Sequence, residues 1–461
     1  MRLDAGGSRN ARPVLVSLFS GAGGMDLGFA RNGCRIRMAC EILRVAAETY
    51  SRNFGLPLHD WDKSPRAPDL PAVVRGDAAR VDFRVAGHAD AVAGGPPCQD
   101  FSVVRGPEQD RRGLEVERGR LYMHFVRALA AVQPKVFVFE NVPGLLSANR
   151  GLAYHRIFAD LRDLRRCWPE IRRKIGEDAS APPPPDYEVV FARVVNAADV
   201  GVPQSRRRLI LIGVRRDILG GRFLEATWIC DRHLLGLDML FRKYPVTPLE
   251  VFEGRPLPEL RQRYAEIMQA YADILPNGWG DAVEDYIRLV GAEPASAAEL
   301  ERAFEQHEQV LRRLGYAGRP VYEVRPSDGS ARPPRESPQV LRRMRMIPPG
   351  ENISAVRGDN PETEGLDISL MYRRLHPLKP AYTVVAYGGG GTWGYHYERS
   401  RSRLTNRERA RLQTFPDEFL FSGTSQQQRA QIGEAVPPLL AESIARACRD
   451  ILELCGEAPS S

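Results

Sequence analysis

The first 54 residues alternate short apolar runs, glycine turns and helical segments, and this alternation restricts the fold more than any other feature of the sequence. Residues 14–19 form a β-branched apolar run, residues 20–24 a glycine-rich turn, and residues 25–32 carry apolar side chains at helical spacing. The same order of strand and helix recurs at residues 36–40 and 45–54, at 89–93 and 121–132, and at 136–139 and 154–164. Strands that alternate with helices predict a doubly wound α/β fold with a parallel sheet.

The rest of the chain indicates two lobes. Further strands are predicted at residues 188–195 and 209–214, so we expect the first part of a catalytic domain at residues 14–216. The segment 217–370 is rich in Pro and Arg and has no glycine-turn signature, which indicates a smaller inserted domain. Residues 371–455 are expected to return to the first domain and complete it.

The C-terminal segment offers several local predictions. We expect a strand at residues 382–386. Thr405 and Glu408 have the spacing of a capping box that begins a helix, and Ser425 with Gln428 has the same spacing. Apolar side chains then recur on one face of a closing helix, which we expect to pack on the first domain.

The composition is that of a globular protein and permits a polyanionic partner. The 461 residues include 65 Lys and Arg against 58 Asp and Glu, a net charge of +7, and 43% are hydrophobic. This balance excludes a disordered chain, and no apolar run approaches the roughly 20 residues of a membrane helix. The excess of Arg favours phosphate and base contacts, although GC-rich codon usage explains it equally well. The seven Cys are scattered without a Cys-x-x-Cys pair, so we expect no metal site and a reducing cytoplasm.

Polar residues that follow predicted strands can carry chemistry. Cys98 stands in Gly94-Gly-Pro-Pro-Cys98, where a rigid turn presents a thiol at a strand end, although most lone cysteines are small buried apolar residues. Glu140 ends the next strand and would lie beside Cys98, as a proton donor or as an ion-paired acid. Arg206 and Arg208 would point to one side of an extended segment, unless they belong to a solvated charge run.

The glycine turn at residues 20–24 and two acids indicate a nucleotide-like cofactor. Gly21 and Gly23 leave main-chain NH groups accessible to a ligand, whereas a plain tight turn needs only one Gly. Glu41 ends the second strand, where a carboxylate can accept hydrogen bonds from ribose hydroxyls. Asp77, after Gly76, stands where we expect another strand to end. Either acid could instead be an exposed turn residue.

In this order, the motifs resemble those of the DNA (cytosine-5) methyltransferases. Phe19-Ser-Gly-Ala-Gly resembles the family's cofactor loop, and Gly95-Pro-Pro-Cys98-Gln resembles its nucleophile motif. Glu140-Asn-Val resembles the acid motif, and Gln204-Ser-Arg206-Arg-Arg208 resembles the Gln-x-Arg-x-Arg motif. C-terminal motifs also match, at residues 374–383, 403–416 and 432–438. The resemblance implies the S-adenosylmethionine-dependent methyltransferase fold, a Rossmann-like mixed sheet, with a target-recognition domain at residues 217–370.

The resemblance implies methyl transfer to carbon 5 of cytosine in double-stranded DNA. Cys98 would add to carbon 6 of a flipped-out base, while Glu140 contacts ring nitrogen 3. Arg208 and Arg206 would hold the cytosine oxygen and a nearby phosphate. Ser102 and Arg206 would contact the DNA.

The resemblance also implies that S-adenosylmethionine is held by residues from several motifs. These are Phe19, Gly21, Gly23, Glu41, Ile42, Asp77, Leu121 and Val436. Two positions depart from the common family pattern. Ile42 stands where Trp is frequent, and Glu434 stands where Asn is frequent, so the contact made by that Asn is not carried over to this chain.

The resemblance further implies a bacterial modification methylase that acts as a monomer in the cytoplasm, at the nucleoid, and has no membrane partner. Such an enzyme would protect host DNA beside a cognate restriction endonuclease, although an orphan methylase fits equally well. The alternatives are a tRNA cytosine-5 methyltransferase and a catalytically silent DNA-binding homologue. The long segment 217–370 favours DNA as the substrate, and the presence of Cys98 and Glu140 disfavours the silent homologue.

Overall fold

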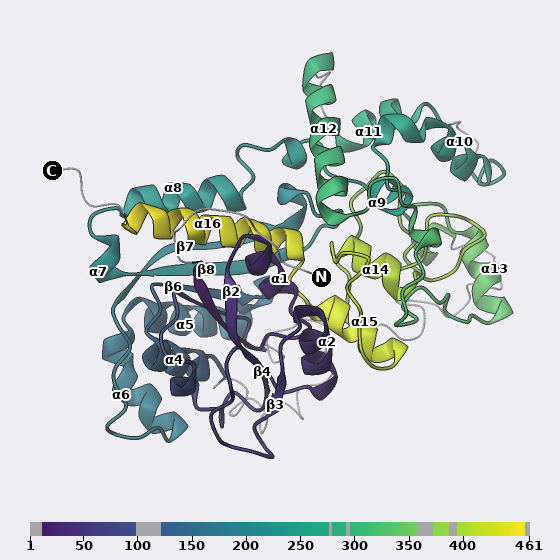
Figure 1. The fold of residues 1–461 in the computed structure, drawn as a ribbon. Helices are drawn as coiled ribbons and strands as arrows, with labels where there is room; N and C mark the ends of the chain where they lie inside the picture. Colours follow the sequence, from purple (N-terminus) through teal and green to yellow (C-terminus); the bar gives the residue numbers. More distant parts are fainter. Residues whose placement is uncertain are drawn as a thin grey trace. The chain divides into compact units, whose positions relative to one another are not determined.

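The computed structural model describes residues 12–97, 121–275, 279–291, 296–356, 372–386 and 394–456. These residues form two compact units whose segments alternate along the sequence (Figure 1). Unit 1 takes its residues from 1–196, 207–237 and 440–461, and unit 2 takes its residues from 197–206 and 238–439.

Unit 1 contains an eight-stranded sheet with the strand order β3-β4-β2-β1-β5-β6-β8-β7. The strands are β1 (Val14–Leu18), β2 (Arg35–Glu41), β3 (Leu58–Asp60), β4 (Ala72–Arg75), β5 (Ala91–Gly94), β6 (Val136–Asn141), β7 (Tyr187–Asn196) and β8 (Arg207–Arg215). Neighbouring strands are parallel except at β8, which runs antiparallel to both β6 and β7. Because β1 lies between β2 and β5, the order reverses at β1, and such a reversal places a ligand crevice at the carboxyl ends of β1 and β5.

Helices cover both faces of this sheet (Figure 1). They are α1 (Gly24–Arg31), α2 (Arg44–Phe54), α4 (Leu121–Val132), α5 (Leu152–Arg162), α6 (Leu164–Ile175), α7 (Arg216–Leu219), α8 (Phe223–Leu234) and, from residue 440 on, α16 (Pro438–Gly456). Alternate strand side chains such as Val16, Leu18 and Phe139 pack with α4, α5 and α6 in one buried apolar cluster. On the other face, Gly28 of α1 meets Ala441 of α16 so closely that an added Cβ would lie 2.4 Å from the Ala441 side chain.

Unit 2 consists of helices and irregular segments held together by buried arginines. Its helices are α9 (Pro248–Glu253), α10 (Arg261–Gln269), α11 (Ala282–Val290), α12 (Ala297–Leu314), α13 (Pro338–Met346), α14 (Asn406–Leu412) and α15 (Ser425–Glu434). Arg411 is fully buried and donates to Asp417, to the Val251 carbonyl at 2.7 Å and to the Arg319 carbonyl at 2.8 Å. Its guanidinium therefore connects α14 to α9 and to the segment after α12.

Most predicted elements are confirmed, with three local differences. The predicted strand at residues 382–386 is wrong: these residues belong to no strand, and the isolated bridge next to them joins Gln204 to Ala381. The capping box of Thr405 is confirmed at the start of α14, whereas the second box begins at Thr424 instead of Ser425. The short edge strand β3 had no signal in the sequence pattern.

The boundaries of the two compact units differ from those of the expected segments 14–216, 217–370 and 371–455. Residues 371–439, expected to complete the first domain, fold with unit 2, and only the chain from 440 on belongs to unit 1. Buried Arg374 explains part of this difference, because it donates to the His396 carbonyl at 2.6 Å and to the carbonyl of Met344. A sequence reading treats such an arginine as a surface residue.

Candidate active site

The glycine turn after β1 has a left-handed backbone, but its two NH groups are not accessible as expected: Gly21 NH donates to Glu41, and Gly23 NH donates to the Ser20 carbonyl at 2.9 Å. Gly21 and Gly23 have left-handed φ angles of 55° and 92°, and Phe19 shares this region with a φ of 54°. A Cβ on Gly23 would lie 2.6 Å from the Phe54 ring and 2.9 Å from the Tyr50 ring, so this position lacks room for any side chain. At Gly21 an added Cβ would meet nothing within 4 Å, which leaves open space beside the main chain.

Glu41 lies at the end of β2, and its carboxylate is bound to the glycine turn. It accepts from the Gly21 NH at 2.8 Å and from the Leu43 NH at 2.7 Å, and it is only 7% exposed. A carboxylate has about four acceptor positions. Ile42 is next in the chain and is 54% exposed, an unusual value for an apolar side chain at a strand end.

The other predicted cofactor residues occupy different parts of the structure. Asp77 follows β4, which pairs with β2, and its carboxylate accepts from the Ala79 NH at 2.9 Å. Leu121 is the first residue of α4. Val436 is buried in unit 2, between α15 and α16, and the neighbouring Glu434 is exposed.

Glu140 and Arg208 form an ion pair at the carboxyl end of β6. The distance from Arg208 Nε to Glu140 Oε1 is 2.9 Å, and both side chains are 12% exposed. The antiparallel pairing of β6 with β8, which sets Asn141 opposite Leu209, places the two side chains together. Burial lowers the pKa of Arg208, and the neighbouring Glu140 opposes that change.

The Glu140 carboxylate also lies against the segment that leads to Cys98. A Cβ on Gly95 would come within 2.5 Å of Glu140 Oε2, so only a glycine allows this approach. Cys98 and Ser102 themselves lie outside the described residues, which end at Pro97 and resume at Leu121. Glu140 therefore lies next to Gly95, which is three residues before the predicted nucleophile in the sequence.

Asn141 is a site residue that the sequence reasoning did not assign. Its Nδ2 donates to the Pro96 carbonyl at 3.2 Å, and its Oδ1 accepts from the Val142 NH at 2.8 Å. The amide thereby ties the end of β6 to the Pro-Pro segment that precedes Cys98. The available signal was its position beside Glu140, directly after a buried strand.

Arg206 differs from the expectation that it contacts DNA. Its side chain has no solvent exposure, and its terminal nitrogens donate to main-chain carbonyls of Val384 at 2.9 Å, Gly433 at 2.8 Å and Ala435 at 2.9 Å. A guanidinium held inside unit 2 in this way positions the segment that leads to Val436. Arg206 and Arg208, expected on one side of the chain, thus lie in different units.

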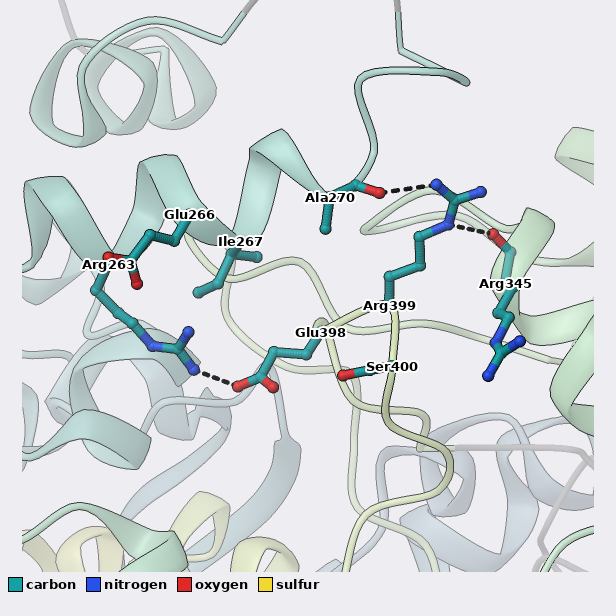
Figure 2. A pocket seen from close by; sticks show the side chains of 8 residues that line it. All are labelled: Arg263, Glu266, Ile267, Ala270, Arg345, Glu398, Arg399 and Ser400. Atoms are coloured by element: carbon teal, nitrogen blue, oxygen red, sulfur yellow. Dashed lines mark hydrogen bonds and ion pairs between the residues drawn. The ribbon is translucent and has the colours of Figure 1, made fainter.

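A pocket of about 410 Å³ lies in unit 2 and is lined by residues between 263 and 400 (Figure 2). Two of its three arginines have partners there: Arg263 pairs with Glu398, and Arg399 donates to the Ala270 carbonyl at 2.7 Å and to the Arg345 carbonyl at 2.9 Å. Figure 2 shows these links across the pocket. The pocket contains none of the predicted catalytic or cofactor residues.

The described residues show neither a metal site nor a membrane span. Within the described ranges, no three His, Cys, Asp or Glu side chains are grouped as metal ligands. In the same part of the chain, no helix has the length and apolar character needed to cross a bilayer.

The fold is shared with a solved structure of a DNA modification methyltransferase encoded within an Escherichia coli prophage. The two structures superimpose with a TM-score of 0.54 at 23% identity, over 96% of this chain and 99% of the other. The likeness shows a shared α/β fold.

Sequence comparisons identify the family. The profile of the C-5 cytosine-specific DNA methylases matches residues 14–166, 184–235 and 288–450. The DNA (cytosine-5-)-methyltransferase M.ApeKI of Aeropyrum pernix is 51% identical, over 96% of this chain and 99% of its own length. The type II methyltransferase M.NgoFVII of Neisseria gonorrhoeae is 33% identical, over 94% of this chain and 85% of its own length. The chain belongs to the C-5 cytosine-specific DNA methylase family and is a DNA (cytosine-5-)-methyltransferase.

Proposed function

We propose that this enzyme methylates a flipped-out cytosine of duplex DNA through a covalent bond to Cys98. The observation that carries the proposal is the Glu140–Arg208 pair, seated against Gly95 just before Cys98 in the chain. A carboxyl fixed by a cation beside a strand-end thiol is the arrangement that activation of a cytosine ring needs.

In the proposed reaction, the Cys98 thiolate forms a bond to carbon 6 while the protonated Glu140 carboxyl gives its proton to ring nitrogen 3. Electron density then moves to carbon 5, which becomes nucleophilic. Bound S-adenosylmethionine supplies the methyl group that carbon 5 accepts. The carbon-5 proton then passes to solvent, the Cys98 sulfur–carbon bond breaks, and the proton on ring nitrogen 3 returns to Glu140, which restores the aromatic ring and the free thiolate. Because carbon 6 is inaccessible in a stacked duplex, the base must leave the helix, at a cost of a few kcal/mol.

The described residues of the glycine turn fit the proposed cofactor. The open space at Gly21 accepts a ligand against the main chain, and the Glu41 carboxylate beside it is an acceptor of the kind that ribose hydroxyls need. Ile42 offers an exposed apolar surface to the adenine, and Asp77 offers an acceptor to the adenine amino group. Phe19, Gly23, Leu121 and Val436 complete the proposed set.

Unit 2 is the proposed source of DNA recognition, and its charge supports this role. Between residues 312 and 345 the exposed arginines are Arg312, Arg313, Arg319, Arg325, Arg332, Arg335, Arg342 and Arg345. Glu323 is the one exposed acid of that fully described stretch. Such an excess of cations suits the phosphate backbone. We place the DNA-facing surface at α13, which carries Arg342 and Arg345.

We propose a modification role in a bacterial cytoplasm, with Ser102 at a DNA phosphate and a cognate restriction endonuclease acting on the same sequence. The support is that two similar proteins are named type II methyltransferases, M.NgoFVII and the Brevibacillus brevis enzyme M.BbvI, which is 31% identical over 91% of this chain. Monomeric action is part of the proposal, since one chain supplies both the site and the recognition unit.

Transfer of labelled methyl groups from S-adenosylmethionine tests this function. The wild type, Cys98→Ala and Glu140→Gln are compared on unmethylated duplex DNA and on bulk tRNA. We expect 5-methylcytosine in DNA with the wild type, none with Cys98→Ala, and a rate about 10²- to 10⁴-fold lower with Glu140→Gln. Transfer to tRNA alone, or to another atom of cytosine, would overturn the proposal.

A further inference from the structure

Asp26 is a buried carboxyl near the glycine turn that the proposed mechanism does not use. It lies in the first turn of α1, three residues after Gly23, and its side chain has 0% exposure. Neither of its oxygens has a hydrogen-bond partner among the described residues. Burial of an unpartnered carboxyl is costly, so its presence at this point calls for a physical reason.

Hydroxyl groups, and no cation, face Asp26 in the described part of unit 1. Ser17 on β1 and Tyr50 on α2 are its polar neighbours, close to the carboxyl but outside hydrogen-bond geometry. The Tyr50 ring also lies against Gly23. Asp26 and Tyr50 therefore support the glycine turn from the inside of the fold.

The charged groups on the other elements packed around α1 have partners of their own. Arg31, at the end of α1, pairs with Glu442 of α16 at 3.1 Å. On β2, Glu41 accepts from main-chain NH groups of the glycine turn and of Leu43. Neither pair supplies a positive charge to Asp26.

The ionisation of Asp26 falls near neutral pH. Burial raises the pKa of Asp26 to about 6, and the hydroxyls of Ser17 and Tyr50 oppose this rise. At neutral pH the carboxyl is thus mostly negative, in an interior where a charge acts more strongly than in water. A cation bound at the glycine turn would offset this negative charge.

We propose that Asp26 is a positioning residue whose buried negative charge favours the cationic form of the cofactor at the glycine turn. Asp26 acts through the electrostatic field and through the Tyr50 contact, without touching the cofactor. The inference rests on the proposed function, because it needs the cofactor at Gly21 and Gly23. It predicts selectivity for S-adenosylmethionine over S-adenosylhomocysteine, which lacks the sulfonium charge.

Calorimetric binding of both ligands to the full-length protein, from pH 5 to pH 8, tests the inference. For the wild type, the ratio of the two dissociation constants should move about three- to tenfold toward S-adenosylmethionine as pH rises. In Asp26→Asn, which keeps the shape and removes the charge, the ratio should not change with pH. Tyr50→Phe removes one hydroxyl near the carboxyl, so the transition should remain and move to higher pH.

Glu48→Gln is the matched control, because Glu48 is an exposed acid of α2 that pairs with Arg44. Its ligand ratio should follow that of the wild type. A pH-independent ratio in the wild type, or an Asp26→Asn protein that loses affinity for both ligands equally, would overturn the inference while the proposed function stands. If Asp26→Asn fails to fold, the wild-type and Tyr50→Phe profiles decide. Failure of the wild type to bind either ligand would overturn the proposed function and the inference together.

Discussion

Glu140 accepts from Arg208 Nε at 2.9 Å through Oε1, while its Oε2 lies where a Cβ of Gly95 would come within 2.5 Å. The carboxylate is therefore held between a cation on β8 and the main chain that leads to Cys98. This relationship assigns Arg208 a specific task, which is to orient the acid. It also explains why the residue at position 95 has no side chain.

Arg208→Lys should lower the rate of methyl transfer about 10- to 100-fold and leave cofactor affinity unchanged. Lys keeps the charge but lacks the planar group that fixes the Glu140 carboxylate. Single-turnover kinetics with duplex DNA measure the effect, with the exposed neighbour Arg207→Lys as the control. Wild-type kinetics in Arg208→Lys would contradict the orienting role.

Gly95→Ala should reduce transfer at least about 100-fold with little loss of stability, because its Cβ would displace the Glu140 carboxylate. The control is Gly221→Ala, since a Cβ at Gly221 would meet nothing within 4 Å. Methyl-transfer rates and urea unfolding measure both variants. An active Gly95→Ala enzyme would show that the acid does not need this close approach.

Arg206→Ala should act on stability. Its guanidinium donates to three buried carbonyls, and each bond from a charged donor contributes about 1.5–3 kcal/mol. Urea unfolding should therefore show a large loss for Arg206→Ala, and none for the exposed Arg207→Ala. If Arg206→Ala instead folds normally and weakens DNA binding with a smaller salt dependence, Arg206 contacts phosphate and its buried position here is not the functional one.

The buried pair of His307 and Glu250 should make the stability of unit 2 depend on pH. His307 donates to Glu250 at 2.9 Å and to the Tyr244 carbonyl at 2.9 Å, so both ring nitrogens carry protons. Burial acts against both charges. The mutual attraction nevertheless raises the pKa of His307 from 6.5 and lowers the pKa of Glu250 from 4.5.

The contribution of this pair is complete between about pH 4.5 and 6.5. It is lost as pH falls through the lowered pKa of Glu250 and as pH rises through the raised pKa of His307. Urea midpoints measured against pH should show this maximum in the wild type and lose it in His307→Gln, with a destabilisation of about 3–5 kcal/mol. The exposed His88→Gln is the control, and an unchanged profile in His307→Gln would refute the prediction.

Removal of Arg342 and Arg345 together should weaken binding to all duplex sequences and reduce the salt dependence of the affinity by about one unit per lost phosphate contact. Titrations at several salt concentrations measure this. Arg312→Ala is the control, because Arg312 lies on α12, outside the proposed DNA-facing surface. Equal salt slopes for the double variant and the wild type would move the DNA surface away from α13.

Most of the sheet could be predicted because its signals are local. The glycine turn, the strand that carries Glu140 and the capping box at Thr405 each depend on a few adjacent residues. The pairing of Glu140 with Arg208 depends on the antiparallel strand β8. The alternation of Arg206 with Arg208 indicated an extended segment but not which strand it would pair with.

The units of the chain and the role of Arg206 could not be predicted because they depend on distant contacts of buried charges. Arg407, for example, is fully buried and donates to the Phe419 carbonyl at 2.8 Å and to Asp328 at 3.2 Å. An arginine that satisfies its donors on remote carbonyls has the same sequence signature as a solvated one. Asp26 was missed for the same reason, since acids in the first turn of a helix are usually exposed.

The covalent role of Cys98 is the central claim, and trapping with 5-fluorocytosine tests it most directly. Sequencing of the methylated product first gives the target site, and a duplex with 5-fluorocytosine at that site is then incubated with enzyme and S-adenosylmethionine. Because fluorine cannot leave as the proton does, the account predicts a denaturation-resistant complex whose crosslinked peptide contains Cys98, and no complex with Cys98→Ala. Methyl transfer without such a complex, or transfer by Cys98→Ala, would contradict it.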